Sequence, residues 1–280
     1  MTDERPRKLG AGDLTACPAT SSGADTTLDD DQRPELTIVV PAYNESARLP
    51  RTLSDIDQFI ATRPFSVELL VVDDGSDDDT CRLAQQHPST AASYQVLRLP
   101  HRGKASAVRA GVLAASGRHV LFTDADLSTP IDYATKLTDA LDAGADVAIG
   151  SREGIGATRV GEPSYRHVMG RVFNAVVRLL AVPGINDTQC GFKAFQREAA
   201  QAIFTRTILH AGDGVVDGPR VTGFDVEVLY VARRLGYTIA EVPVYWEHVV
   251  GSKVQPLPDS FRMFADVLRV RWNAIRGRYH

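Results

Sequence analysis

The sequence predicts an α/β fold, in which a mainly parallel β-sheet is flanked by helices in a single domain. Short apolar runs alternate along the chain with segments of helical periodicity. The apolar runs are continuous, which is typical of strands that are buried on both faces. Polar residues gather directly after four of these runs, and the carboxyl ends of parallel strands are where such sheets bind ligands.

Five runs of apolar and β-branched residues predict the strands. They lie at residues 36–40, 67–72, 94–99, 119–124 and 146–151. Strands that alternate with helices at this spacing are joined by right-handed crossovers and run parallel to one another. We therefore expect the polar residues that follow the runs to converge at one edge of the sheet.

Segments of helical periodicity connect the strands. Leu49, Leu53 and Ile56 recur at steps of three and four residues, which predicts a helix after the first strand. The segment 103–117 is rich in small residues, which suits a helix that packs closely on a sheet. Further helices are expected across 130–143 and from about Phe224 onward, with a strand at GFKAF (191–195) between them.

The composition excludes several classes of protein. Of the 280 residues, 44% are hydrophobic and 24% are charged, which is ordinary for a soluble domain. The net charge of −4 gives no reason to expect nucleic-acid binding. Cys17, Cys81 and Cys190 show no metal-ligand spacing, which favours reduced thiols and a cytoplasmic location. No run approaches the roughly 20 apolar residues of a membrane span, and the first residues lack the apolar core of a signal peptide.

The chain divides into three parts of unequal length. Residues 1–34 contain no aromatic residue and few aliphatic ones, so this segment is expected to be a disordered tail. Residues 35–257 carry the strands and helices of the folded domain. Residues 258–280 are expected to form a basic amphipathic helix at the C-terminus.

The C-terminal segment allows two interpretations. Its large apolar residues follow helical spacing, and they are Phe261, Phe264, Leu268 and Trp272 or Ile275. Five arginines accompany them from Arg262 to Arg278, against the single acid Asp266. Such a helix either lies in an anionic membrane interface, as a peripheral anchor, or packs on the domain with its arginines in water.

Two carboxylates one residue apart suggest a metal site. Asp124 and Asp126 follow the fourth strand, and residues i and i+2 of an extended chain point to the same side. Their mutual repulsion is removed by a cation, and Mg²⁺ and Mn²⁺ accept carboxylates while leaving positions for phosphate oxygens. The alternative is a solvated turn in which one aspartate caps the helix that begins near Thr129.

The motifs of the chain resemble those of a known family. Four of them are similar to motifs of family-2 glycosyltransferases with the GT-A fold, and they are VVPAYNE (39–45), VVDDGSDDDT (71–80), DADLSTP (124–130) and GSR (150–152). Five more resemble the polyprenyl-phosphate sugar synthases, and they are RGKASAVRAG (102–111), DTQCGFKAF (187–195), GFDVEVLY (223–230), VPVYW (242–246) and GSK (251–253). The dolichyl-phosphate glucosyltransferase branch is the most similar, and the resemblance spans residues 35–273.

The resemblance implies a reaction and its partners. One sugar, with glucose from UDP-glucose favoured, moves with inversion from a nucleotide sugar to a polyprenyl phosphate at a membrane surface, or with a membrane protein as partner. Two other functions stay open. One is a soluble glycosyltransferase of the same fold with a small hydroxylated acceptor. The other is a module that binds a nucleotide sugar without turnover.

The resemblance also assigns residues to roles. The residues implied to bind the nucleotide sugar are Pro41, Tyr43, Glu45, Asp73, Asp74, Lys104 and Asp124. Those implied to bind the metal, Mg²⁺ or Mn²⁺, are Asp124 and Asp126. The residues implied to bind the acceptor phosphate are Arg152 and Arg166, with Arg171 and Lys193 as weaker candidates. The residues implied to be catalytic are Asp126, Arg152 and Asp225. The chain departs from the mannosyltransferase pattern at Ser128, where a Gln is common, and at Gly170, where a Ser is common.

The acceptor decides whether a general base is needed. A phosphate is already ionised, so it attacks without losing a proton, whereas a hydroxyl acceptor requires a base. Asp225 and Glu227 either orient sugar hydroxyls or act as that base, or they are ordinary acids at a helix N-terminus, which the helix dipole favours. His101, His210 and His248 share no metal spacing and are expected to be structural or surface residues, and Cys190 a packing residue.

Overall fold

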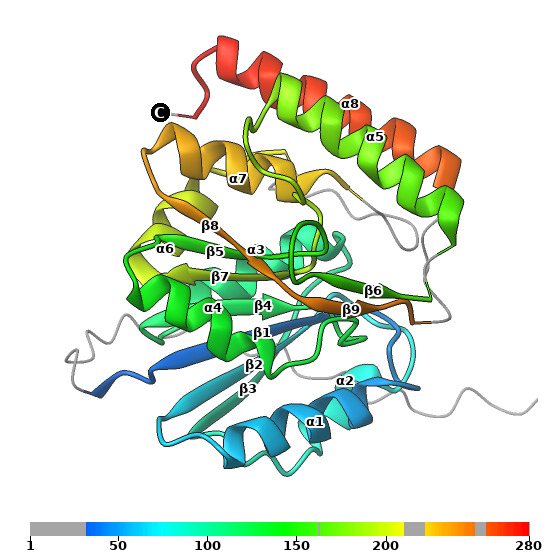
Figure 1. Cartoon of the computed structure of the whole chain (residues 1–280). Coiled ribbons are helices and arrows are strands. Elements are labelled where there is room, and N and C mark those ends of the chain that lie inside the picture. The colour runs from blue at the N-terminus through cyan, green and yellow to red at the C-terminus, as the bar shows by residue number, and fades with distance from the viewer. Residues whose placement is uncertain (1–31, 162, 210–221, 250–255, 280) are drawn as a thin grey trace, which may run out of the picture.

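A seven-stranded sheet forms the centre of the computed structural model (Figure 1). The structure describes residues 32–161, 163–209, 222–249 and 256–279, without the side chains of 164–166 and 256–261. The strand order is β3-β2-β1-β4-β7-β5-β8, and β6 and β9 form a separate pair. The strands are β1 (Leu36–Ala42), β2 (Val67–Asp73), β3 (Ser93–Arg98), β4 (His119–Thr123), β5 (Val147–Ser151), β6 (Thr158–Val160), β7 (Phe192–Gln196), β8 (Ile239–Pro243) and β9 (Tyr245–Glu247).

The sheet is parallel except at one strand. β1 pairs with β2 and β4 in parallel, β2 with β3, and β5 with β8. β7 runs antiparallel between β4 and β5, and it joins the two parallel groups into one sheet. The carboxyl ends of β1, β2, β4 and β5 therefore open toward the same edge, as the sequence predicts.

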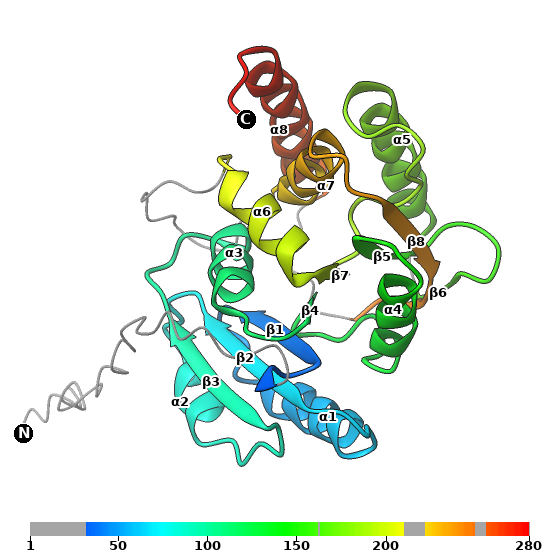
Figure 2. The ribbon, with the colours of Figure 1, turned by 90° about the vertical axis from the view of Figure 1, so that its left-hand side faces the viewer.

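Helices cover both faces of the sheet (Figure 2). One face packs against α1 (Leu49–Ala61), α2 (Thr80–Gln85) and α4 (Tyr133–Asp142). The other packs against α3 (Lys104–Ala114), α5 (Ser164–Leu180), α6 (Arg197–Arg206), α7 (Phe224–Arg234) and α8 (Pro256–Ile275). Alternate residues of β1 serve the two layers, since Val39 belongs to the second core and Ile38 and Val40 to the first.

The predicted strands, the predicted helices and the mainly parallel sheet are confirmed, with small differences in the bounds. The small residues of α3 allow the close approach expected of them. A Cβ at Gly111 would overlap the side chain of Val39 and come within 2.8 Å of Val72 Cγ2. A larger residue there would push α3 away from the sheet and displace the loop that leads into it.

The expectation that all the cysteines are reduced thiols is wrong for Cys81. Cys81 is disulfide-bonded, so the spacing of cysteines along the chain is a poor guide to their pairing in space. Cys190 is a free thiol, and burial raises its pKa. It packs beside Thr129, which agrees with a packing role.

The C-terminal helix packs on the domain, but with a different stripe from the predicted one. α8 contacts α5 and α7 and buries Met263, Val267 and Val270. Four residues of the predicted apolar stripe have described side chains, and all four are exposed: Phe264, Leu268, Trp272 and Ile275. None of the helices in the described part of the chain is long and apolar enough to cross a bilayer. The predicted tail, up to residue 31, and the GSK motif (251–253) lie outside the described residues.

Candidate active site

The loops that follow β1 and β2 are joined to each other by hydrogen bonds. The backbone N–H of Asn44 donates to Ser76 Oγ (2.9 Å), and the side-chain oxygen of Asn44 accepts from the N–H of Asp77 (2.9 Å). The N–H of Glu45 donates to Thr80 Oγ1 (2.8 Å). Asn44 has a φ of 51°, a left-handed conformation that asparagine tolerates better than most residues. These bonds fix the backbone directly after Tyr43 without using its ring.

Tyr43 stacks on a histidine from a third loop. The Tyr43 and His101 rings are parallel within 4°, with their centroids 3.8 Å apart. His101 Nδ1 lies 2.8 Å from the carboxylate of Asp74. That carboxylate also accepts the backbone N–H groups of Arg102 (2.9 Å) and Gly103 (2.8 Å). Asp74 therefore holds the turn before α3. No motif marks His101, whose contact with Tyr43 only the folded chain reveals.

Asp73 is buried with one carboxylate oxygen unsatisfied. Its Oδ1 accepts the N–H of Ser76 at 3.3 Å. Its Oδ2 makes no hydrogen bond, and the nearest cationic atom is Arg98 Nε at 3.5 Å. Burial raises the pKa of this carboxyl above its ordinary value, although Ser76 and Arg98 oppose the shift. A buried acceptor without a donor is costly, so this oxygen is suited to receive an N–H or O–H group from a ligand.

Asp124 and Asp126 lie directly beyond β4, with Lys104 beside them. Lys104 begins α3, and its ammonium forms an ion pair with Asp124. Burial acts to lower the pKa of Lys104, but the carboxylates of Asp124 and Asp225 outweigh it and raise the pKa. Asp126 accepts the N–H of Ser128 at 3.0 Å. A Cβ at Gly191 would overlap the Asp124 carboxylate, so the glycine of the CGF motif makes room for this acid.

These two carboxylates fit a hard divalent cation. Both offer oxygen donors, and the Lys104 ammonium already places a positive charge against Asp124. Within the described part of the chain, no three His, Cys, Asp or Glu residues gather into a metal cluster. A cation held by Asp124 and Asp126 would therefore take its other ligands from a bound phosphate and from water.

Arg152 is held by a buried carboxylate. Its Nε and one terminal nitrogen donate to the two oxygens of Asp187 at 2.7 and 2.9 Å, and its backbone N–H donates to the same carboxylate at 3.0 Å. Asp187 is fully buried; burial would raise its pKa, but Arg152 holds that pKa well below the usual range. The guanidinium also lies over the ring of Trp246, 5.4 Å from the centroid. Asp187 stands in the DTQCGFKAF motif, which could have identified it as a partner for an arginine.

Lys193 and Asp225 form a second buried pair. Lys193 is fully buried, and its Nζ donates to Asp225 Oδ1 and to the carbonyl of Cys190, both at 2.5 Å. The structure therefore places Lys193 behind Asp225 rather than at the surface. Glu227, two residues further along α7, accepts from the backbone N–H groups of Ile208 and Leu209 and from Tyr279. Glu227 is thus a structural acid, whereas Asp225 is within electrostatic reach of Lys104.

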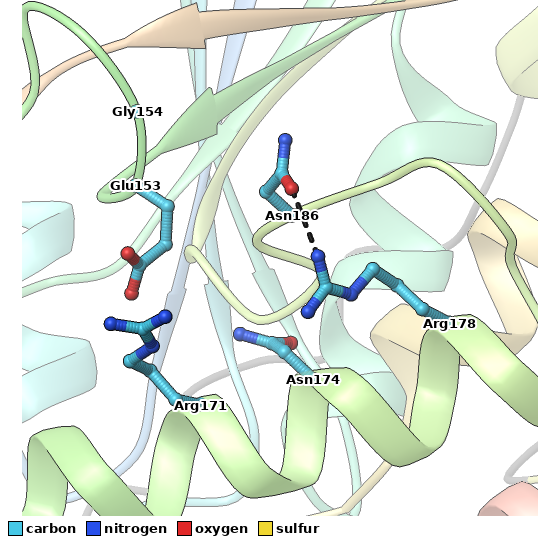
Figure 3. A pocket seen from close by; sticks show the side chains of 6 residues that line it. All are labelled: Glu153, Gly154, Arg171, Asn174, Arg178 and Asn186. Carbon is cyan, nitrogen blue, oxygen red and sulfur yellow. Dashed lines mark hydrogen bonds between the residues drawn. The ribbon is translucent and has the colours of Figure 1, made fainter.

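An arginine-lined pocket lies between α5 and the loop after β5 (Figure 3). It has a volume of about 190 Å³, and its lining residues are Glu153, Gly154, Arg171, Asn174, Arg178 and Asn186. Arg178 donates to Asn186 at 3.1 Å, and Figure 3 shows Arg171 pointing toward Glu153. Arg166 belongs to the first turn of α5, but its side chain lies outside the described residues.

The sheet order and the acids at its carboxyl edge are those of the GT-A fold. Two solved structures share this fold. Glucosyl-3-phosphoglycerate synthase from Mycobacterium tuberculosis, in complex with Mn²⁺ and UDP-glucose, aligns with a TM-score of 0.59 and 22% identity over 87% of this chain and 81% of its own. Mannosyl-3-phosphoglycerate synthase from Rubrobacter xylanophilus aligns with a TM-score of 0.56 and 18% identity over 88% and 75%.

Residues 37–204 match the model of glycosyl transferase family 2, and the chain belongs to this family. Its curated relatives include two named dolichyl-phosphate β-glucosyltransferase. The one from Drosophila melanogaster is 38% identical over 87% of this chain and 76% of its own length. The one from Homo sapiens is 34% identical over 88% and 77%. The resemblance inferred from the motifs is therefore confirmed.

Proposed function

We propose that this chain transfers glucose from UDP-glucose to a polyprenyl phosphate, with inversion and with the help of Mg²⁺ or Mn²⁺. The names of the relatives support the sugar and the class of acceptor. The solved structure with Mn²⁺ and UDP-glucose offers a precedent for donor and metal on this fold. We expect the reaction to occur on the cytoplasmic side of a membrane, where the lipid phosphate is accessible to the chain.

One observation carries the proposal: the arginine-lined pocket borders the Arg152–Asp187 pair, and Cys190, which lies within electrostatic reach of that pair, is followed by Gly191, which lies against the carboxylate of Asp124. Glu153 and Asn186 line the pocket, and each is next to one member of that pair in the chain. A sugar nucleotide with its cation is suited to the acidic side. A phosphate monoester is suited to the arginines, whose planar guanidinium matches phosphate oxygens.

The loops after β1 and β2 are proposed to bind the base and ribose. The ring of Tyr43 offers a flat face for the base, with His101 supporting the opposite face. The unsatisfied oxygen of Asp73 would accept a base N–H. Pro41 and Glu45 shape the loop around Tyr43, and Asp74 contributes by fixing the turn that carries His101.

Asp124, Asp126 and Lys104 are proposed to hold the diphosphate. The divalent cation would be ligated by the two aspartates and would neutralise charge that develops on the leaving nucleoside diphosphate. The ammonium of Lys104 pairs with Asp124 in this structure, and it would also contact the diphosphate and neutralise part of its negative charge. Asp225 lies within electrostatic reach of Lys104 and is held by Lys193, so it is positioned to accept hydrogen bonds from sugar hydroxyls.

Arg171 is proposed to bind the acceptor phosphate, together with Arg166 and Arg152. Arg171 lines the pocket, while Arg152 is fixed by Asp187 at its edge. In the reaction, a phosphate oxygen attacks the anomeric carbon as the bond from that carbon to the UDP oxygen breaks. The electron pair leaves with UDP. Since a phosphate monoester carries about −1.5 to −2 charge at neutral pH, no proton has to be removed from it.

The proposal is tested by supplying radiolabelled UDP-glucose with Mg²⁺ or Mn²⁺ and one of three acceptors. These are a short-chain polyprenyl phosphate, the corresponding polyprenol, and 3-phosphoglycerate. We expect a labelled lipid product with the polyprenyl phosphate alone. Transfer to 3-phosphoglycerate would favour a soluble glycosyltransferase with a small hydroxylated acceptor. Binding of UDP-glucose without transfer to any acceptor would favour a binding module.

A further inference from the structure

Lys193 is a buried lysine in the middle of the central sheet. It lies on β7, where it pairs with Phe122 of β4 on one side and with Ile149 of β5 on the other, and its side chain has no exposed surface. A buried ammonium is costly unless an opposite charge and hydrogen-bond acceptors surround it. A ligand does not reach a side chain without exposed surface, so any part that Lys193 takes in the reaction must pass through its neighbours.

The ammonium of Lys193 joins two segments that are far apart in the chain. Its Nζ donates to Oδ1 of Asp225, in the first turn of α7, and to the carbonyl of Cys190, in the loop before β7, with both distances at 2.5 Å. The same nitrogen lies 5.5 Å from the centroid of the Phe122 ring. These contacts fix the start of α7 relative to the loop that leads into β7.

Asp225 is anchored through one of its two oxygens. Within the described part of the chain, Oδ1 accepts from Lys193, while Oδ2 has no hydrogen-bond partner and the side chain keeps 10% of its surface exposed. The charge of Asp225 also reaches Lys104, whose pKa burial would lower but Asp124 and Asp225 raise. An ionised carboxylate only accepts hydrogen bonds. The second oxygen of Asp225 is therefore left for an O–H group of a ligand.

The second hydrogen bond of Lys193 acts on the side of the diphosphate. The carbonyl that it holds belongs to Cys190, and the next residue is Gly191. A Cβ at Gly191 would overlap the carboxylate of Asp124, so this turn packs directly on that acid. One ammonium thus determines the position of two acids, Asp225 by direct contact and Asp124 through the turn.

We propose that Lys193 is a positioning residue of the transfer reaction, which fixes the acid for the donor sugar relative to the acid for the diphosphate. Transfer requires the anomeric carbon and the leaving oxygen to keep one geometry, and a displacement of about 1 Å in such a site is costly. The inference rests on the proposed function, which assigns Asp225 to the sugar hydroxyls. It replaces the phosphate-binding part that the sequence suggests for Lys193.

The test is a double-mutant cycle with one control. Lys193→Met removes the ammonium but keeps most of the side-chain volume, Asp225→Asn removes the charge of its partner, and the double variant removes both charges of the buried pair. Lys136→Met makes the same substitution at an exposed position of α4 and is the control. Calorimetry with Mn²⁺ and no acceptor measures the affinity of each protein for UDP and for UDP-glucose. Transfer to a short-chain polyprenyl phosphate is measured separately.

We expect Lys193→Met and Asp225→Asn each to lower the affinity for UDP-glucose, relative to that for UDP, at least about fivefold. Each should lower kcat at least about tenfold and leave UDP binding unchanged, as in the control. Because Lys193 acts through Asp225, the loss in the double variant should be well below the product of the two single losses. The calorimetric result needs no acceptor, so it separates a failure of this inference from a failure of the proposed reaction.

Three outcomes would overturn the inference. The first is a pair of losses that multiply in the double variant, since Lys193 would then act independently of Asp225. The second is a Lys193→Met variant that behaves like Lys136→Met. The third is a Lys193→Met variant that keeps its affinity for UDP-glucose and loses affinity for the polyprenyl phosphate, which would make Lys193 a phosphate ligand. If Lys193→Met alone fails to fold, the cycle is read by comparing Lys193→Arg with the wild type, and an unchanged UDP-glucose affinity and kcat in a variant whose longer fork displaces Asp225 would likewise overturn it.

Discussion

The two halves of the active site hold their charges by different means. In the donor half, Asp74 accepts backbone N–H groups from the loop before α3, and Asp126 accepts one from its own loop. In the acceptor half, Arg152 and Lys193 are held by opposite charges, Asp187 and Asp225. Backbone donors fix a carboxylate and leave its charge in place. Ion pairs fix a side chain and neutralise it. Asp126 is therefore ready for a cation, whereas Asp124 pairs with Lys104, and the acceptor half depends on pocket arginines such as Arg171.

The largest effect is expected at the donor side. Asp126→Asn should lower kcat by roughly 100- to 1000-fold, because an amide is a poor substitute for a carboxylate that ligates the cation. The melting temperature should stay close to that of the wild type. Steady-state kinetics with titrated Mn²⁺ measure the loss, and Asp132→Asn, an exposed acid beside α4, is the control. Full activity in the variant, or in wild type with EDTA, would show that the reaction does not depend on a metal at Asp126.

The next effect tests the buried pair of the acceptor half. Asp187→Asn should lower the free energy of unfolding by about 3–5 kcal/mol at neutral pH, because Arg152 would lose the buried carboxylate that accepts three of its hydrogen bonds. The same change in an exposed pair, Asp142→Asn beside Arg118, should cost about 1 kcal/mol or less. Denaturant titrations of both variants provide the comparison. An equal loss of unfolding free energy in the two variants would show that burial does not strengthen the Arg152–Asp187 pair.

The same pair predicts a pH dependence. The folded pKa of Asp187 is lowered, so its stabilising contribution is present above the unfolded pKa of about 3.9. That contribution is lost as the pH falls through the folded value. The difference between wild type and Asp187→Asn should thus be constant from about pH 7 to pH 5 and should narrow below about pH 4. A difference that grew toward acid pH would assign the effect to another group.

A smaller effect separates donor from acceptor. Arg171→Ala should weaken apparent acceptor affinity about 10- to 150-fold, the range for a charge-assisted hydrogen bond, and leave UDP binding unchanged. Asp73→Asn should do the reverse, since it alters the group proposed to accept from the base. Calorimetry with UDP and kinetics with a short-chain polyprenyl phosphate measure the two, with Arg51→Ala as a surface control. Loss of UDP binding in Arg171→Ala would move this arginine to the diphosphate.

The smallest effect is expected at the N-terminus. Under reducing conditions, which open the disulfide of Cys81, removing residues 1–33 should leave the melting temperature and kcat nearly unchanged, because this segment has too little apolar content to pack on the domain. Differential scanning fluorimetry and the transfer assay measure the outcome. A fall of several degrees would mean that part of the segment contributes to the folded domain.

The sequence predicts the fold well because buried parallel strands and their helices leave clear patterns. The acids that follow β1, β2 and β4 could be placed at one edge of the sheet for the same reason. The residues that these acids contact could not be predicted from the sequence. Asp73 and Asp74 are neighbours with the same side chain, yet one has an unsatisfied oxygen and the other holds the turn at His101. That difference arises from loops that meet only in the folded chain.

Helix faces are the second limit of the sequence. The stripe of Leu268 and Trp272 follows helical spacing as clearly as the stripe of Val267 and Val270, and only the second is buried. Periodicity reveals that a helix has an apolar face, but not which of two faces the fold will cover. In the same way, the positive charge of Lys193 suggests a phosphate ligand until its burial against Asp225 is known.

The proposed reaction is an inverting transfer of glucose from UDP-glucose in the donor half to a phosphate in the acceptor half. The most direct test is the anomeric configuration of the product. Wild-type protein is incubated with UDP-α-glucose, Mn²⁺ and a short-chain polyprenyl phosphate, and the product is examined by proton and phosphorus NMR. An inverting transfer should give a β-glucosyl phosphodiester and one UDP released for each product formed. An α-linked product, glucose attached to a hydroxyl, or free glucose alone would contradict it.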